Sequence, residues 1–520
     1  MCRQPGAARS SRVLIVAALA LVAAGCTKHG TSASPSAPSS PPPASSAPAS
    51  SSPPARAPVL RAPADPVTVI AATKPEQESV QLSQALFASS PAAVVTSPDQ
   101  PSASAAAVTS QKLGLPLLVA DPAATAAVDD EIHRLGCDHV LLVGTAEAPD
   151  GVQAVHDVSQ LPPLSPPEPR HDTTVLVHAL DAVKADAETE AATVAATATA
   201  HAAGATVVPV HGSDPRADPA AIDALADAPA SHVLAVGADF GPAAKLTSRL
   251  AVARTGVQLP GGGQTIFPGR RFVALYGHPG TASLGVLGAQ DLDASIARAK
   301  DLAAQYDPLS EVPVVPTFEI IATVAQGAPG KDGNYSGESS VDSLRPWVEK
   351  ASAAGFYVVL DLQPGSADLL DQAKLYTPLL ELPDVGLAID PEWALGPGQR
   401  PLQQIGSVDA SRINAVGAWL DGLTAAKHLP EKLFVLHQFR LSMIGNEPKL
   451  KTNFDNLAVL IHMDGQGTQP NKAATWHSVV TSAPKGVPFG WKNFTKEDHP
   501  MLSPEQTMAR TPKPMMISYQ

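Results

Sequence analysis

The sequence is poor in cysteine, aromatic residues and positive charge. Only three of its 520 residues are cysteine, too few for a disulfide framework or for a zinc site made of repeated Cys-x-x-Cys pairs. Lys and Arg total 36 against 49 Asp and Glu, for a net charge of −13, so the overall cationic field of a general nucleic-acid binder is missing. Phe, Trp and Tyr together reach only 4%. These shortages exclude a small disulfide scaffold and a nucleic-acid factor.

Apolar residues nevertheless make up 44% of the chain, enough for cores built mainly from Ala, Val and Leu. A length of 520 residues favours two or more domains. The 52 prolines exceed the 37 glycines, which indicates that part of the length is linker. The composition therefore predicts two or more globular domains, with part of the length as linker.

The N-terminus carries the pattern of a secretory signal. Arg3, Arg9 and Arg12 precede an uncharged apolar run over 13–24, too short for a transmembrane helix, which needs about 20 residues. Small residues then lead to Cys26, an arrangement that resembles the signal of bacterial lipoproteins. The resemblance implies that 1–26 is a lipoprotein signal peptide cleaved before Cys26, that Cys26 becomes the lipidated (palmitate-type acylated) mature N-terminus, and that the protein is anchored in the membrane on the extracytoplasmic face.

Residues 27–66 are almost entirely Ser, Pro and Ala. Such a stretch cannot bury enough apolar surface to offset its chain entropy. We therefore expect a disordered tether between the anchor and the folded part of the protein.

Residues 67–260 alternate short apolar runs with helical patterns, which predicts an α/β domain with a parallel sheet. The expected strands are 67–72, 92–96, 115–121, 139–144, 174–178, 206–210 and 232–237, and the expected helices are 75–88, one ending at 112, 124–135, 182–203, one near 220, and 243–254. No Gly-x-Gly-x-x-Gly or P-loop follows any of these strands, so no nucleotide site and no cofactor is expected.

The first of these units carries motifs of a known family. They are the helix with Ser79, Leu82, Ser83 and Leu86-Phe87, the strand Ala93-Val94-Val95, Lys112-Leu113-Gly114, Leu117-Leu118-Val119-Ala120-Asp121, Leu135-Gly136, and Val140-Leu141-Leu142-Val143-Gly144. In order and spacing this unit resembles the cell wall-binding repeat type 2 family of Gram-positive surface proteins. The resemblance implies attachment to anionic wall polymers and an envelope location.

After a glycine-rich break at 259–264, residues 265–520 contain eight further apolar runs. They are 271–277, 316–323, 356–361, 385–390, 432–437, 457–462, 487–491 and 514–519. Helical patterns over 292–304, 341–354, 366–377 and 410–426 lie between them. Eight strands with covering helices in about 250 residues predict a (β/α)8 TIM-like barrel.

Polar residues gather at the ends of these predicted strands, where barrels of this kind form their active sites. Side chains two apart share a face of a strand, so each pair is expected to point to the same mouth. The candidates are Tyr276 with His278, Asp361 with Gln363, Asp390 with Glu392, His462 with Asp464, and His437.

The segment Asp390-Pro391-Glu392-Trp393 resembles the Asp-x-Glu motif of barrel-type glycoside hydrolases, including muramidases and chitinase-like enzymes. Glycoside hydrolysis needs one carboxylic acid with a raised pKa and a second carboxylate. Glu392 is the expected acid, its pKa raised by Asp390, and Asp361 or Asp464 is the expected second carboxylate. Trp393 and Trp491 are candidates for stacking on a sugar ring.

Two alternatives stay open. His278, Asp361, Asp390, His437, His462 and Asp464 would also suit a zinc-like ion, although neither His-x-His nor His-Glu-x-x-His is present; a metal-dependent hydrolase is therefore ranked lower, with no metal assigned. The barrel could instead bind a wall polymer or glycan without acting on it.

Overall fold

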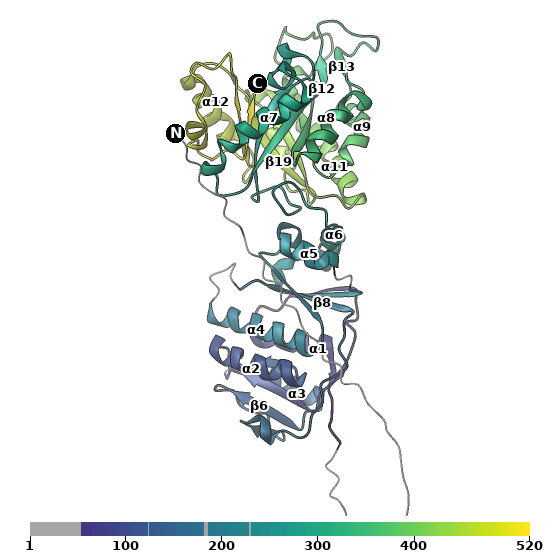
Figure 1. Ribbon diagram of the computed structural model, residues 1–520, viewed down its shortest axis with the longest axis vertical. Helices are drawn as coiled ribbons and strands as arrows, with labels where there is room; N and C mark the ends of the chain where they lie inside the picture. The colour runs from purple at the N-terminus through teal and green to yellow at the C-terminus, as the bar shows by residue number, and fades with distance from the viewer. Residues whose placement is uncertain (1–53, 123, 181–185, 228–229) are drawn as a thin grey trace, which may run out of the picture. The chain divides into compact units, whose positions relative to one another are not determined.

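Two parallel β-sheets and a closed β-barrel make up the described part of the chain (Figure 1). The computed structural model describes residues 54–520, except 123, 181–185 and 228–229. The predicted signal peptide, Cys26 and most of the predicted tether lie outside the described residues. Residues 54–66, which the composition assigns to the tether, include strand β1 (Val59–Leu60), which pairs with β3 (Phe87–Ser89). Regular secondary structure thus begins before residue 67.

The N-terminal half holds two four-stranded parallel sheets, where the sequence predicted one parallel sheet. The first has the order β5-β4-β6-β7 and consists of β4 (Ala92–Thr96), β5 (Leu117–Val119), β6 (His139–Val143) and β7 (Gln153–Val155). The second has the order β2-β10-β8-β9 and consists of β2 (Val67–Ile70), β8 (Thr173–His178), β9 (Thr206–Val210) and β10 (His232–Val236). Strand β2 precedes the first sheet in the chain but pairs with β10 of the second. The chain therefore leaves one sheet, builds the other, and returns.

Six α-helices cover these sheets. They are α1 (Pro75–Leu86), α2 (Gln100–Leu113), α3 (Ala126–Leu135), α4 (Ala187–Ala202), α5 (Pro219–Asp227) and α6 (Ala243–Ala253), with short 3-10 turns η1 (Val158–Gln160), η2 (Pro215–Ala217) and η3 (Ala238–Phe240). Helices α1 and α4 pack between the two sheets, in a core rich in alanine and valine. Helices α5 and α6 pack on the other face of the second sheet. Because α4 is buried on most sides, its small Ala and Thr side chains let neighbouring elements approach closely.

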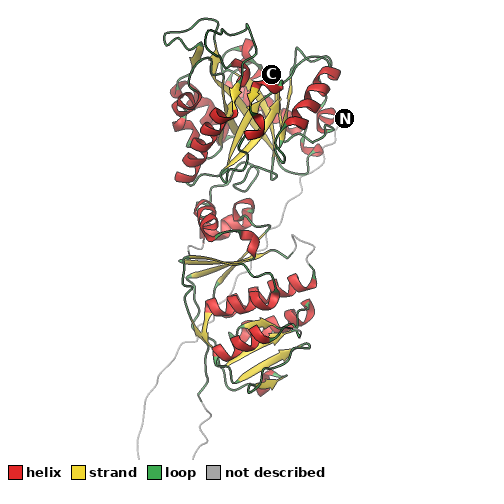
Figure 2. Ribbon diagram, turned by 180° about the vertical axis from the view of Figure 1, so that it is seen from behind, coloured by secondary structure: helices red, strands yellow, loops and turns green. Residues whose placement is uncertain are grey.

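The C-terminal half is a closed barrel of eight parallel strands (Figure 2). They are β11 (Arg271–Gly277), β12 (Val314–Ala325), β14 (Tyr357–Leu362), β15 (Val385–Ile389), β17 (Lys432–His437), β19 (Leu457–Met463), β20 (Phe489–Asn493) and β21 (Met516–Tyr519). Each pairs with the next, and β11 closes the ring by pairing with both β12 and β21. All eight predicted strands are confirmed, and so is the parallel barrel. The short β13 (Ser336–Glu338) adds an antiparallel edge to β12.

The helices around the barrel follow the prediction only in part. They are α7 (Leu292–Ala304), α8 (Val341–Ala353), α9 (Leu369–Leu375), α10 (Thr377–Leu380), α11 (Ala410–Ala426), α12 (Gln469–Ser482) and α13 (Pro504–Met508). Helix α12 was not predicted. Between β17 and β19 the chain forms 3-10 turns and the short strand β18 in place of an α-helix. The remaining short elements are η4 (Ala282–Leu284), η5 (Val286–Ala289), η6 (Asp307–Leu309), η7 (Pro391–Trp393), β16 (Val408–Asp409), η8 (Leu441–Met443), β18 (Ile444–Gly445) and η9 (Glu447–Lys449).

The barrel interior changes character along its axis. Its lower part is an apolar cluster that includes Phe272, Ala274, Val315, Tyr357, Val359, Ala388, Leu433, Val435, Leu460 and Met516. Nearer the carboxyl end of the strands, the same inward face carries buried polar groups: Tyr276, Glu319, Asp361, Asp390, His437, His462 and Ser518. The apolar layer fills the barrel at the amino-terminal ends of the strands. The polar layer is therefore open only toward their carboxyl ends.

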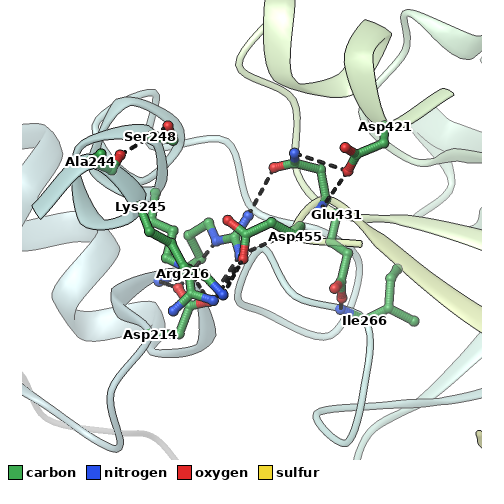
Figure 3. A network of polar contacts seen from close by, with 11 residues as sticks. Asp214, Arg216, Ala244, Lys245, Ser248, Ile266, Asp421, Glu431 and Asp455 are labelled. Atoms are coloured by element: carbon green, nitrogen blue, oxygen red, sulfur yellow. Dashed lines mark hydrogen bonds and ion pairs between the residues drawn. The ribbon is translucent and has the colours of Figure 1, made fainter. Parts of the chain in front are cut away.

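A buried ion cluster connects the second sheet's helices to the opposite, amino-terminal end of the barrel (Figure 3). Arg216 is buried and pairs with Asp214 at 2.9 Å. It also donates hydrogen bonds to the carbonyl of Asp455 at 2.9 Å and to the Asn456 amide oxygen at 3.2 Å, just before β19. The Asp455 carboxylate accepts a hydrogen bond from Arg249 at 2.8 Å.

Among the helices of the described residues, none is both long and apolar enough to cross a membrane.

Candidate active site

A cavity of about 350 Å³ opens at the carboxyl ends of the barrel strands. Its wall is formed by Tyr276, Gln363, Asp390, Glu392, Trp393, Leu402, Phe439, Asp464, Gly465, Gln466, Lys492, Phe494 and Gln520. Six of the residues predicted from the sequence are among them: Tyr276, Gln363, Asp390, Glu392, Trp393 and Asp464. Three more, Asp361, His437 and His462, are fully buried below them.

Tyr276 and Asp361 lie on β11 and β14, on either side of β12. The Tyr276 hydroxyl donates a hydrogen bond to Asp361 Oδ2 at 2.8 Å, and Gln363 Nε2 donates to the same hydroxyl at 3.4 Å. Burial raises the pKa of Asp361, and burial together with the Asp361 charge raises the pKa of Tyr276 well above its ordinary value. Tyr276 therefore stays a neutral donor that fixes Asp361 in place.

His437, at the end of β17, binds carboxylates with both ring nitrogens. Nδ1 lies 3.1 Å from Asp464 Oδ2, and Nε2 lies 2.9 Å from Glu319 Oε1. Burial by itself would lower the pKa of His437, but Glu319, Asp464 and Asp361 raise it well above its ordinary value. The ring is thus an imidazolium that donates on both sides.

This imidazolium decides the state of Asp464. Burial would raise the pKa of Asp464, but the hydrogen bond and the charge of His437 lower it below its ordinary value. Asp464 is therefore an ionised carboxylate with one oxygen held by His437. Its other oxygen, Oδ1, has no hydrogen-bond partner among the described residues.

Glu392 has the opposite electrostatics. It lies in the 3-10 turn η7 directly after β15, and among the described residues no group donates a hydrogen bond to its carboxyl. Burial and then the Asp464 charge raise the pKa of Glu392 to about 7. Burial and then the Glu392 charge raise the pKa of Asp390 well above its ordinary value. The pocket thus combines two carboxyl groups whose pKa values are raised with one carboxylate whose pKa is lowered.

His462 is fully buried beneath the residues that line the cavity. Its Nε2 lies 2.7 Å from the Ser518 hydroxyl, and burial followed by the charges of His437 and Lys492 lowers its pKa well below the ordinary value. The ring fits only because residue 490 is glycine, since a Cβ there would lie 1.9 Å from His462 Nδ1. His462 is a neutral spacer beside the His437 imidazolium.

Lys492, on β20, lines the cavity and was missed by the sequence analysis. It is 2% exposed, and its Nζ lies 3.4 Å from the centroid of the Tyr276 ring. Lys492 follows the end of the predicted strand 487–491 by one residue. The alternation of side chains along that strand would have found it, since Trp491 faces outward and its neighbour must face inward. Glu319 shares the inward face of β12 with Thr317 in the same way.

Two predicted residues lie elsewhere. His278 leaves the strand end and contacts Ser339 at 3.0 Å and Thr281 at 3.3 Å. Trp491 is fully buried outside the barrel wall, packed against Trp476 of α12 with ring centroids 5.5 Å apart. It belongs to the contact between strand and helix and does not border the cavity.

The predicted metal ligands do not form a coordination site. Within the described parts of the chain, no group of three or more His, Cys, Asp or Glu side chains is arranged to hold a metal ion. His437 directs both nitrogens at carboxylates and His278 lies apart. The donor set proposed from the sequence therefore does not fit a metal in this arrangement.

No protein-family model matches the chain, and a search of the curated proteins found no match either.

Proposed function

We propose that the barrel acts on a glycan, as a glycoside hydrolase-like domain in which Glu392 is the general acid and Asp464 the second carboxylate. The observation that carries the proposal is the separation of their pKa values within one cavity: about 7 for Glu392, and below the ordinary range for Asp464. Two carboxyl groups driven apart in this way are the pattern of acid and base assignments. Glu392 would protonate the glycosidic oxygen, while Asp464 would stabilise the sugar cation or activate water.

Asp464 suits the second role better than Asp361. Each of the two residues has one oxygen in a hydrogen bond and one, Oδ1, without a partner among the described residues. Asp464 lines the cavity, whereas Asp361 is fully buried and is not part of its wall. Asp390, with its raised pKa, would act as a second neutral acid beside Glu392.

The rim supports a sugar as the ligand. Trp393, Phe439, Phe494 and Leu402 place apolar surface around the charged floor. Sugar rings have apolar faces and polar edges, so they match aromatic walls above hydrogen-bonding groups. Leu402 is 82% exposed and has a φ of 64°, an unfavourable conformation for leucine. Its exposed apolar side chain at the cavity wall would be covered by a bound sugar ring.

We further propose that the protein is attached to the cell envelope. The signal-like 1–26, the lipidation motif at Cys26 and the Ser/Pro/Ala-rich 27–66 favour a lipid-anchored protein on the extracytoplasmic face. The likeness of 67–260 to wall-binding repeats favours a wall polymer as the partner of that part. The barrel would then be held close to its substrate.

The decisive experiment measures sugar release from peptidoglycan and from wall polysaccharides by the purified full-length protein. Release that is lost in Glu392→Gln and in Asp464→Asn, and kept in the exposed-site control Glu349→Gln, supports the proposal. Release only after addition of a divalent metal would favour metal-dependent hydrolysis. Retained binding without release from any substrate would leave a binding module.

A further inference from the structure

Lys492 is a buried cation that the proposed reaction does not use. Lysine is rarely buried without a partner, because its charge loses solvation. In the described chain, no carboxylate lies within 4.0 Å of Lys492 Nζ, whereas the buried Lys472 of α12 pairs with Asp498 at 2.6 Å. The described contacts of Lys492 Nζ are with the rings of Tyr276, at 3.4 Å, and Phe494, at 5.5 Å.

The Lys492 charge lowers the pKa values of Asp361, Glu392 and Asp464, but none of these three carboxyl groups forms an ion pair with it. Asp464 is bound by the His437 imidazolium and Asp361 by the Tyr276 hydroxyl. Glu392, with a pKa of about 7, is only partly ionised at neutral pH. A cation–π contact compensates only part of a desolvated charge, on the order of 2 kcal/mol. The Lys492 ammonium group therefore lines the cavity without a direct ion pair, and a negative group on a ligand could supply one.

We infer that Lys492 binds an anionic substituent of the substrate, so that the glycan is an acidic one carrying a carboxylate or a phosphate on the sugar in this cavity. The amides of Gln363 and Gln466 line the same cavity and supply neutral donors for the remaining sugar oxygens. Lys492 is thus a specificity-determining residue. That the ligand is a sugar rests on the proposed function. That it carries a negative charge rests on the position of Lys492.

The test is calorimetric binding of sugars that differ in charge but little in shape. N-acetylmuramic acid carries a carboxylate, and its methyl ester keeps the bulk without the charge. For phosphate, the binding of N-acetylglucosamine 6-phosphate is compared with that of N-acetylglucosamine. The wild-type protein should prefer the charged member of at least one pair by about 10- to 100-fold, as expected for a hydrogen bond to a charged group. The pair that shows the preference identifies the anion.

Lys492→Met should remove that preference, so that the charged and the neutral member of the pair bind with about equal affinity. Lys496→Met, at an exposed position four residues further along the chain and beyond the end of β20, should keep the preference. Equal binding of charged and neutral sugars by the wild type, no binding of any of them, or a preference that survives Lys492→Met would each overturn the inference. If Lys492→Met does not fold, as judged by circular dichroism, the wild-type comparison still decides.

Binding and hydrolysis fail separately in this design. Binding is measured a second time in Glu392→Gln, which has no general acid. A charge preference in a protein that releases no sugar would contradict the proposed hydrolysis and leave the role of Lys492 standing. Hydrolysis without a charge preference would support the proposed function and contradict the role of Lys492.

Discussion

The open sheets and the closed barrel are built from the same kind of strand, yet they treat polar strand ends differently. His178 ends β8 of an open sheet, and its Nε2 contacts Asp239 at 3.0 Å with both side chains partly exposed. His437 ends β17 of the barrel and contacts Asp464 and Glu319 with no exposure of its ring. An open sheet spreads its strand ends along an edge that water reaches. A closed ring brings them to one point and removes the water.

Ring closure therefore changes pKa values that the residue types alone would not. Aspartate, glutamate and histidine have ordinary pKa values in water, and burial with charged neighbours moves them in directions set by their contacts. In the barrel, Asp464 and Glu392 move in opposite directions within one cavity. The difference between the two regions thus lies in topology more than in composition.

The largest expected effect is on catalysis, from the same change made in each region. Asp464→Asn should lower sugar release by about 10³-fold, since it removes the charged member of the pair. Asp239→Asn, its counterpart in the open sheet, should leave the rate within twofold of the wild type. Steady-state rates for both variants, with circular dichroism to verify folding, make the comparison. Equal losses would mean that barrel closure confers no special chemistry.

The next effect concerns the ion cluster that connects the two regions. Arg216→Met should lower the free energy of unfolding by about 3 kcal/mol, because Asp214 and Asp455 lose a buried partner. Arg345→Met, which breaks the half-exposed pair with Glu349, should cost less than about 1 kcal/mol. Urea unfolding curves measure both. A small loss at Arg216 would show that the cluster contributes little to stability.

Glu431 sharpens the comparison at the amino-terminal end of the barrel. Burial raises its pKa from 4.5 to about 7, so the folded protein holds this proton more tightly than the unfolded chain does. The wild type therefore loses stability as pH rises from about 4.5 through 7. Glu431→Gln keeps an acceptor for the Ile266 amide and should be more stable than the wild type by about 2 kcal/mol at pH 8.

At pH 4 the two proteins should unfold at the same urea concentration. The control Glu381→Gln, at a partly exposed ion pair with Lys427, should show no such pH dependence. A constant difference between Glu431→Gln and the wild type at all pH values would rule out the buried titration as its cause.

The smallest effect is expected at the open sheet. The exposed pair of His178 and Asp239 should contribute less than about 0.5 kcal/mol, as surface ion pairs usually do. Asp239→Asn should therefore leave the thermal midpoint within a degree or two of the wild-type value. A loss of several kcal/mol would mean that the open edge is as desolvated as the barrel mouth.

Much of the fold follows from the sequence because buried parallel strands are continuous apolar runs. The runs at 271–277 and 432–437, for example, coincide with β11 and β17. Helix α12 was missed because it is polar on most sides and buries little beyond Trp476 and Val479. The two-sheet arrangement was missed because strand order depends on long-range pairing, such as that of β2 with β10.

The site divides in the same way. The prediction that Asp390, Glu392 and Asp464 share one cavity agrees with the structure, although Glu392 reaches it from the turn η7 and not from a strand. Alternation along a strand was not applied one residue further to Lys492, nor to the middle of β12, where Glu319 lies. The partners that decide the chemistry, such as Glu319 with His437, come from strands more than 100 residues apart in the chain. No local pattern specifies such a contact.

The central claim, that the closed barrel turns Glu392 into an acid poised near neutrality, is tested most directly by titrating that one carboxyl group. Carbon-13 NMR of the purified protein with labelled glutamate side chains, compared with Glu392→Gln, identifies its signal. The account predicts a midpoint near pH 7 that falls in Asp464→Asn, since that variant removes the neighbouring negative charge. A midpoint near 4.5, unchanged in Asp464→Asn, would contradict the account.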